Sequence, residues 1–230
     1  MKTIASSVLV VLAAAGAAEG QGLRPVGNPS VRVGGGVVLA QPIGAFADQV
    51  DLGYGLAGHA VWTPAPNGVF SLRLDGMFLV YGSETRRYQL LPLIDVDVTT
   101  RNQVAGLQIG PQLTVGKGVL RFYGYSQIGF SYFATTSSVE GSGNVQSFAN
   151  TTNFDDVTLA ASGGGGVLVR LGRGRTPVAL DLGARYLHNG RVRYLREGSI
   201  AIDGNDVTIS PIESQANLVV YQVGVSIGLR

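Results

Sequence analysis

The segment Val219-Val220-Tyr221-Gln222-Val223-Gly224-Val225-Ser226-Ile227-Gly228-Leu229-Arg230 alternates between two kinds of side chain. One face carries Val219, Tyr221, Val223, Val225, Ile227 and Leu229, and the other carries Gln222, Gly224, Ser226, Gly228 and Arg230. Successive side chains of a strand point to opposite faces of a sheet, so a period of two is typical of a β-strand. The segment therefore predicts a strand with one apolar face and one small, polar face.

Seven other segments repeat this pattern, and they begin at Val31, Asp51, Val69, Asn102, Leu120, Val157 and Val178. Short connections (Thr63 to Gly68, Gly116 to Gly118 and Gly172 to Arg175) alternate with long ones (residues 82–100, 135–155 and 188–215). In an up-and-down antiparallel barrel, odd connections lie at one end and even connections at the other. The alternation of short and long connections therefore predicts a barrel with short turns at one end, marked by Lys117, Arg173 and Arg175, and long loops at the other.

The N-terminal residues predict export. Met1-Lys2 supplies a positive charge, and Ile4 to Ala15 is largely apolar with no acidic residue. Small residues with the spacing of a cleavage site follow at Ala15-Gly16-Ala17 and Ala18-Glu19-Gly20. We predict a secretory signal peptide over residues 1–20, a short lead over 21–30 and one barrel over 31–230. The chain has no cysteine, which excludes disulfides and thiolate metal sites.

The composition favours a surface that largely avoids water. Charged residues make up 14% of the chain, against about 25% in typical soluble domains. A net charge of +2 gives no reason to expect a nucleic acid partner. No later stretch approaches the roughly 18 continuous apolar residues of a membrane helix. A closed sheet is the other structure that can cross a bilayer, so we predict an all-β fold: an eight-stranded antiparallel up-and-down transmembrane β-barrel.

The direction of the apolar face separates two kinds of eight-stranded barrel. In a soluble lipocalin-like barrel the apolar face would line a ligand cavity. Here the opposite face consists of Gly, Ala, Ser and Gln with a few charges, which suits a narrow interior. Aromatic residues also lie near the strand ends on the apolar face, as in the two interfacial girdles of membrane barrels. The predicted girdle is Tyr54, Trp62, Phe70, Phe78, Phe122, Phe130, Tyr132, Tyr186 and Tyr221.

On these features the chain resembles small eight-stranded outer membrane proteins with OmpA- or OmpX-like barrel domains, over Val31 to Leu229. The resemblance implies a bacterial outer membrane location, periplasmic short turns, extracellular long loops and membrane lipid as a partner. It also implies that the terminal strand with Tyr221, Val223, Val225, Ile227 and Leu229 is the signal read by the outer membrane insertion machinery. Such signals usually end in an aromatic residue, whereas this chain ends in Leu229-Arg230.

Several charged residues lie on the predicted inward face: Arg32, Asp51, Arg73, Asp75, Arg121, Arg170, Asp181 and Arg185. Unpaired charges in a confined interior are costly, so we expect these residues to neutralise one another in ion pairs. The interpretation is a polar plug, because eight strands leave a lumen that side chains nearly fill. The alternative is a narrow porin-like channel lined by the arginines.

No enzymatic site or cofactor is predicted. Gly53 to Gly58 matches a dinucleotide fingerprint, but the strand alternation runs straight through it, and Gly163 to Gly166 lacks the Lys of a phosphate-binding loop. His59 and His188 have no acidic or serine partner at a recognisable spacing, so a membrane-embedded enzyme is the least favoured class. The acidic pairs Asp155-Asp156, Asp95 with Asp97, and Asp203 with Asp206 follow no calcium-loop spacing, so we interpret them as solvated loop charges.

The long connections are where we expect function, in a structural or surface-interaction role. Residues 135–155 are rich in Ser, Gly, Asn and Thr, as exposed loops are. Residues 188–215 contain their own alternation, with a turn candidate at Asp203-Gly204-Asn205-Asp206. This pattern predicts a hairpin beyond the membrane, where an exposed strand edge could pair with an unidentified extracellular ligand.

Overall fold

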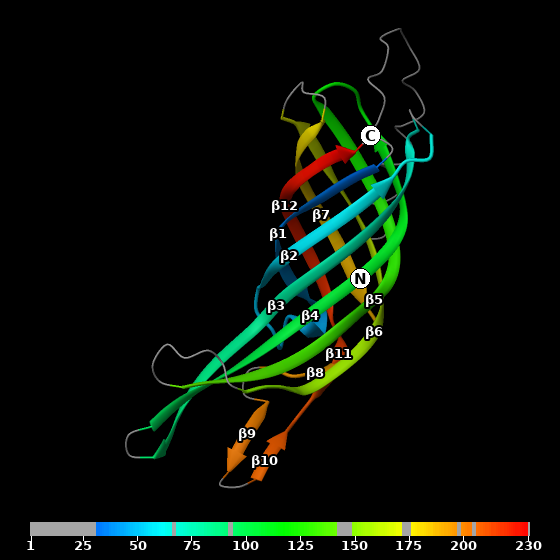
Figure 1. The fold of residues 1–230 in the computed structure, drawn as a ribbon. Helices are drawn as coiled ribbons and strands as arrows, with labels where there is room; N and C mark the ends of the chain where they lie inside the picture. Colours follow the sequence, from blue (N-terminus) through cyan, green and yellow to red (C-terminus); the bar gives the residue numbers. More distant parts are fainter. Residues whose placement is uncertain are drawn as a thin grey trace.

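A computed structural model describes residues 31–65, 68–91, 94–141, 149–171, 176–196, 199–203 and 206–229. Eight antiparallel strands form a closed barrel in the order β1-β12-β7-β6-β5-β4-β3-β2 (Figure 1). They are β1 (Val31–Ile43), β2 (Gly53–Trp62), β3 (Phe70–Leu91), β4 (Ile94–Val115), β5 (Leu120–Gly141), β6 (Ala149–Arg170), β7 (Val178–Asn189) and β12 (Asn217–Leu229). The predicted eight-stranded antiparallel barrel is confirmed.

The two ends of the barrel differ, as the connection lengths predict. At the short-turn end, β4 and β5 are joined through Gly116 and Gly118, whose φ angles of 109° and 80° suit glycine. The predicted short turn at residues 172–175, with Arg173 and Arg175, lies outside the described residues. At the opposite end, called the loop end below, β3 to β6 continue well past the other barrel strands (Figure 1).

Two segments that we expected to be loops are mostly strand. β3 and β4 pair from Phe70↔Leu113 to Leu91↔Ile94, so residues 82–100 form the outer part of a long hairpin. β5 and β6 likewise pair into the segment 135–155. Hydroxyl pairs join neighbouring strands here, with Thr85 to Thr99 at 3.0 Å and Thr100 to Ser137 at 2.9 Å. In residues 82–91 and 135–155 the sequence alternation is weak because polar residues stand at both odd and even positions. Residues 94–98, Ile-Asp-Val-Asp-Val, do alternate, and the expectation of a loop there was wrong.

The segment 188–215 forms the predicted hairpin, built from four short strands. β8 (Arg191–Tyr194) pairs with β11 (Ile212–Gln215), and β9 (Ile200–Asp203) pairs with β10 (Asp206–Ile209). We call residues 191–215 the β8–β11 hairpin. Residues 204–205 of the predicted turn lie outside the described part of the chain.

The connection between β1 and β2 folds back on the barrel. It contains a single-turn 3-10 helix, η2 (Gly44–Phe46), which places Phe46 in a fully buried position. Within the described ranges, no helix is long and apolar enough to cross a membrane.

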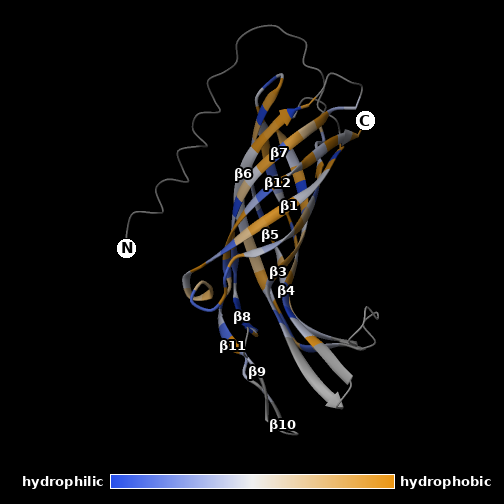
Figure 2. Cartoon of the chain, turned by 90° about the vertical axis from the view of Figure 1, so that its left-hand side faces the viewer, coloured by the Kyte–Doolittle hydropathy of each residue, from blue (hydrophilic) through white to orange (hydrophobic). Residues whose placement is uncertain are grey.

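The outer face of the barrel is an uncharged apolar belt. Every barrel strand exposes large apolar side chains, including Leu159 at 82% and Ile128 at 70% exposure. None of the outward positions carries a charge over residues 31–41, 54–62, 70–80, 103–115, 120–132, 157–169, 178–186 and 219–229. Figure 2 shows apolar colouring along the barrel strands. The prediction of an outward apolar face is therefore confirmed, and the lipocalin-like alternative is wrong.

Gly55 provides a test of the tight packing between β2 and β3. A Cβ atom at Gly55 would overlap the carbonyl oxygen of Phe78 on β3, whereas a Cβ at Gly76 would meet nothing within 4 Å. We expect Gly55→Ala to lower the free energy of unfolding by about 1–3 kcal/mol, as overpacking does. Gly76→Ala is the matched control. Urea unfolding in lipid vesicles, followed by the fluorescence of Trp62, measures both, and equal stabilities would contradict the expectation.

Candidate functional site

Charged and amide side chains fill the middle of the barrel. Arg73 on β3 donates from Nε and Nη2 to both oxygens of Asp75, at 2.6 and 2.9 Å, and from Nη1 to Gln112 Oε1 at 3.0 Å. Gln127 on β5 donates to Asp75 Oδ2 at 2.7 Å, and Arg185 Nη1 lies 3.5 Å from Asp75 Oδ1. Arg73 and Asp75 are each 2% exposed. The two-pronged pairing neutralises charges that would otherwise be costly to bury.

A second carboxylate, Asp181 on β7, lies in the same layer. Tyr123 donates its hydroxyl hydrogen to Asp181 Oδ1 at 2.6 Å, and His59 Nε2 lies 3.6 Å from Asp181 Oδ2. The Arg73 guanidinium lies 4.5 Å from the ring centroid of Tyr125 and 5.4 Å from that of Tyr123. These cation–π contacts link the two carboxylates through one arginine. We call this set of residues the central cluster.

The remaining predicted interior charges lie elsewhere. Arg32, Arg121 and Arg170 line the short-turn end of the lumen. Asp51 is a correction: it is exposed, it precedes the first residue of β2, and it lines a pocket at the loop end. The reason is that β2 begins only at Gly53, so the alternation that was extended back to Asp51 does not apply there.

Neutral residues that were not predicted as site residues complete the central cluster. Gln112, Gln127, Tyr123 and Tyr125 occupy inward positions that the alternation identifies, but nothing in their identity marks them as partners of a charge. The pairing of His59 with Asp181 was missed because β2 and β7 are distant both in the sequence and in the strand order. Only closure of the barrel brings these two side chains together.

The loop end of the lumen is closed by apolar side chains. The Phe46 ring lies edge-on to Tyr194, Tyr81 and Phe133, with centroid distances of 5.0, 5.6 and 6.3 Å. Phe46 is 0% exposed, and Phe133 and Tyr194 are 1% exposed. Below these rings lie Val38, Ala40, Leu79, Val104, Leu187, Leu218 and Val220, all buried. We call this set the apolar cap.

The apolar cap corrects the expected composition of the interior. The inward residues were expected to be Gly, Ala, Ser and Gln with a few charges. That description fits the middle of the lumen, but the loop-end part is as apolar as a soluble protein core. The cap is also built partly from segments outside the barrel wall, since Phe46 comes from η2 and Tyr194 from β8.

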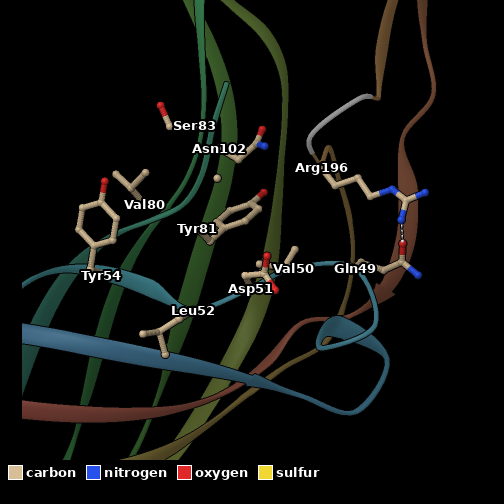
Figure 3. Close-up of a pocket in the computed structure, with 11 residues that line it drawn as sticks. Gln49, Val50, Asp51, Leu52, Tyr54, Val80, Tyr81, Ser83, Asn102 and Arg196 are labelled. Atoms are coloured by element: carbon tan, nitrogen blue, oxygen red, sulfur yellow. Dashed lines mark hydrogen bonds between the residues drawn. The ribbon is translucent and has the colours of Figure 1, made fainter. Parts of the chain in front are cut away.

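A pocket of about 450 Å³ lies beside the cap, where β3 continues past the start of β2 (Figure 3). Tyr81, Asn102 and Tyr54 line it, and Arg196 closes one side by donating from Nη1 to Gln49 Oε1 at 2.6 Å. The Tyr81 hydroxyl also donates to the Leu195 carbonyl at 3.4 Å. The pocket mixes aromatic, amide and charged groups and faces water.

The predicted girdle residues all lie on the outer face. Tyr54, Trp62, Phe70, Phe78, Phe122, Phe130, Tyr132, Tyr186 and Tyr221 are exposed. None of these nine girdle residues therefore belongs to the central cluster or to the apolar cap. The outward residues of the terminal strand, Val223, Val225, Ile227 and Leu229, are also exposed and continue the apolar belt.

The described residues do not assemble a recognisable reaction centre. Among them, no group of three or more His, Cys, Asp or Glu side chains could hold a metal ion. His59 Nδ1 is buried without a hydrogen-bond partner in the described chain. A base that activates a nucleophile needs that nucleophile within hydrogen-bond reach. His59, Asp181 and the Tyr123 hydroxyl form one buried set of contacts within the central cluster.

Comparisons with known proteins find similarities to solved structures only. No family model matches the chain, and no curated protein matches it. OprG of Pseudomonas aeruginosa is 11% identical with a TM-score of 0.47, over 90% of this chain and 98% of that one. Ail, the attachment invasion locus protein of Yersinia pestis, crystallised with the heparin analogue sucrose octasulfate, is 12% identical with a TM-score of 0.40, over 87% and 97%. The N-terminal barrel of Pseudomonas aeruginosa OprF is 13% identical with a TM-score of 0.33, over 87% and 98%. Similarities at this level assign no family and carry no argument about function.

The Arg73–Asp75 pair generates a prediction about stability. Arg73→Met leaves a buried carboxylate without its two-pronged partner, so we expect a loss of about 3–5 kcal/mol in the free energy of unfolding. The double variant Arg73→Met/Asp75→Leu removes both charges and should recover part of this loss, because Arg185 and Gln127 also lose Asp75 as a partner. Urea unfolding in vesicles measures all three proteins. If the double variant is no more stable than Arg73→Met, the unpaired charge of Asp75 is not the cause of the lost stability.

The β8–β11 hairpin is attached to β6 through Asp156. Asp156 Oδ2 accepts from the Arg193 backbone N–H at 2.9 Å, and Oδ1 accepts from the Val157 N–H at 2.9 Å. The Arg193 side chain reinforces the contact, with Nε 3.6 Å from Asp156 Oδ2. The hydrogen bond from the Arg193 backbone is the main reason that the pKa of Asp156 lies below its ordinary value of 3.8.

This contact makes the docking of the hairpin dependent on pH. Because the pKa of Asp156 is lowered by docking, the contribution is complete above the ordinary pKa and is lost as pH falls through the lowered one. We expect Asp156→Ala at pH 7 to speed hydrogen exchange at the Arg193 amide about two- to five-fold, equivalent to 0.5–1 kcal/mol for a partly exposed charge. Glu213→Ala, which removes an exposed carboxylate 3.8 Å from Arg191, is the control. Unchanged exchange in Asp156→Ala would show that the hairpin is held by other contacts.

Proposed function

We propose that this chain is a bacterial outer membrane β-barrel with a closed lumen, serving a structural or surface-interaction role. The carrying observation is the uncharged apolar belt around all eight strands. A water-facing barrel with so much exposed apolar surface would aggregate, whereas lipid covers such a surface favourably. Membrane lipid is therefore the first partner.

The size of the belt supports the proposal. On β4 the outward apolar stretch runs from Ala105 to Val115, and the first outward charge beyond it is Arg101. A tilted strand needs about 9–11 residues to cross the hydrocarbon core. The belt on β4 therefore matches the thickness of a bilayer, with the β3–β6 extensions projecting into water.

The proposed orientation of the barrel in the membrane rests on the long strand extensions at its loop end. We propose that the short turns face the periplasm and that the extensions of β3 to β6 and the β8–β11 hairpin face the outside. In this proposal residues 1–20 direct export, and the terminal strand that includes Tyr221 and Leu229 is recognised by the insertion machinery. The paired extensions and the hairpin offer a polar surface and strand edges for a partner outside the cell.

The absence of cysteine allows a direct test of location. Thr208 on the hairpin and Lys117 in a short turn are both exposed and lie at opposite ends. We expect a membrane-impermeant maleimide to label Thr208→Cys in intact cells at least tenfold more than Lys117→Cys, and both equally after lysis. Heat-modifiable migration in gels provides the control for folding. Equal labelling in intact cells, or recovery of the protein as a soluble periplasmic species, would overturn the proposal.

The closed lumen favours a structural barrel over a channel. The central cluster fills the middle of the lumen, and the apolar cap places a dry layer above it. An ion would have to pass both layers. The hydroxyls of Tyr81 and Tyr194 in the cap are already hydrogen-bonded to Leu195 and Ser214, and the other cap side chains named above are hydrocarbon groups that cannot replace a hydration shell.

Conductance separates the closed barrel from the porin-like alternative. We expect no steady current from the purified protein in planar bilayers, and none from Arg185→Ala, because the apolar cap remains in place. Arg101→Ala, which removes an exposed arginine at the loop end, is the charge-matched control. A steady open state in the unmodified protein that Arg185→Ala abolishes would instead establish a pore lined by the interior arginines.

A further inference from the structure

The pocket beside the apolar cap contains a carboxylate that no described side chain neutralises. Asp51 lies between η2 and β2, lines this pocket and is exposed. Within the described ranges its side chain forms no ion pair or hydrogen bond, and this includes Arg196, the cationic residue of the same lining. Small-molecule sites orient their ligands with a few polar or charged groups of this kind. The Asp51 carboxylate is therefore available to a ligand of opposite charge.

Two tyrosine rings line the pocket together with Asp51. Tyr54 lies on β2 with 60% of its surface exposed, and Tyr81 lies on β3 with 8% exposed. In Figure 3 the Asp51 carboxylate lies just below the Tyr81 ring, and the Tyr54 ring lies to the left. The electron-rich face of a tyrosine ring attracts cations. The tyrosines therefore favour the same sign of charge as Asp51 does.

Hydrocarbon groups lie on the same side of the pocket. Leu52 is 57% exposed, and Val80 pairs in register with Tyr54. Such side chains contact carbon atoms favourably and offer nothing to a hydrated metal ion. Calcium or magnesium would need several oxygen ligands, and Asp51 supplies the carboxylate of the lining by itself. The lining therefore favours an organic cation over a metal ion.

Arg196 is held at the opposite side of the pocket. Its Nη1 donates to Gln49 Oε1 at 2.6 Å, and Figure 3 shows this pair on the right, away from Tyr54. The guanidinium keeps its positive charge, because Gln49 is neutral. Arg196 therefore opposes the binding of a cation from across the pocket, but it does not neutralise Asp51 by contact.

We propose that this pocket binds an organic ammonium group, carried by a small solute or by a lipid headgroup. Asp51 supplies the opposite charge, Tyr54 and Tyr81 supply cation–π contacts, and Leu52 and Val80 contact the carbon atoms bonded to the nitrogen. The volume of about 450 Å³ suits a small-molecule site. A lipid can reach the mouth because Tyr54 also belongs to the aromatic girdle. Binding here depends on neither the orientation nor the closed lumen proposed above, so it can fail or succeed independently of them.

The test is a calorimetric titration of the purified full chain in non-ionic micelles. Choline is titrated at constant ionic strength, and so is its uncharged isostere in which carbon replaces the quaternary nitrogen. We expect saturable binding of choline and binding of the isostere at least about tenfold weaker. Asp51→Asn should weaken choline binding about tenfold, as the loss of a charged partner does. Tyr54→Leu keeps an apolar side chain and should weaken it about two- to fivefold.

Two further variants test the sign of the charge effect. Arg196→Gln removes the opposing positive charge and should raise the affinity for choline. Glu213→Gln removes an exposed carboxylate of the β8–β11 hairpin that does not line the pocket, and it should leave the affinity unchanged. Heat-modifiable migration in gels first establishes that each variant folds, and Tyr54→Leu decides the proposal if Asp51→Asn does not fold.

Competition by lipids identifies the source of the ammonium group. Displacement of choline by phosphatidylethanolamine but not by phosphatidylglycerol assigns the site to a lipid headgroup, and no displacement by either assigns it to a soluble molecule. Displacement by both lipids would overturn the proposal, because acyl chains would then occupy the pocket. It is also overturned if choline does not bind saturably, if the isostere binds equally well, or if Arg196→Gln weakens binding as much as Asp51→Asn does.

Discussion

Closure of the sheet between β1 and β12 is the constraint on which the rest of this structure depends. The two strands pair from Val31↔Leu229 to Ile43↔Asn217, so no backbone edge remains open within the barrel wall. A bilayer offers no hydrogen-bond partners to a free edge, and only a complete ring satisfies every backbone group. The first and last strands of the described chain must therefore meet. Lipid can cover the outward apolar belt favourably only when the closed ring has paired the backbone groups behind it.

Closure with eight strands leaves a narrow interior, and two kinds of side chain fill it. The middle contains charges that are neutralised in place, with Arg73 joined to Asp75 by two hydrogen bonds and stacked on Tyr125. The loop end contains apolar rings and aliphatic side chains packed as in a soluble core. The polar layer tolerates burial mainly because Asp75 and Asp181 are paired with cationic and hydroxyl donors, and the apolar layer consists of aromatic and aliphatic side chains whose buried surface needs no polar partner.

The barrel also supports structure beyond the membrane. β3 to β6 continue as a sheet at the loop end, and the β8–β11 hairpin is attached to this sheet through Asp156. The β1–β2 connection contributes Phe46, and the hairpin contributes Tyr194, to the same apolar cap. The β1–β2 connection and the β8–β11 hairpin are therefore fixed to the barrel by the same apolar cap that closes its lumen.

The sequence by itself determined the features that follow from local alternation. Period two along each strand identifies the eight strands, the outward apolar face and the inward positions of Arg73, Asp75 and Asp181. We did not predict the strands within residues 82–91 and 135–155, because polar residues stand at both odd and even positions there. The alternation of Ile94 to Val98 was present in the sequence, but these residues were assigned to a loop. The period-two pattern also placed Asp51 in the interior, although β2 begins two residues later.

Only the tertiary structure decided which inward side chains meet. The contacts of His59 with Asp181, of Arg73 with Tyr125 and of Phe46 with Tyr194 join residues far apart in the chain. These pairs depend on ring closure and on the level of each residue along the barrel axis. Alternation specifies the face of a strand on which a residue lies. The partner across the lumen depends on the register of all eight strands together, and no local pattern encodes that register.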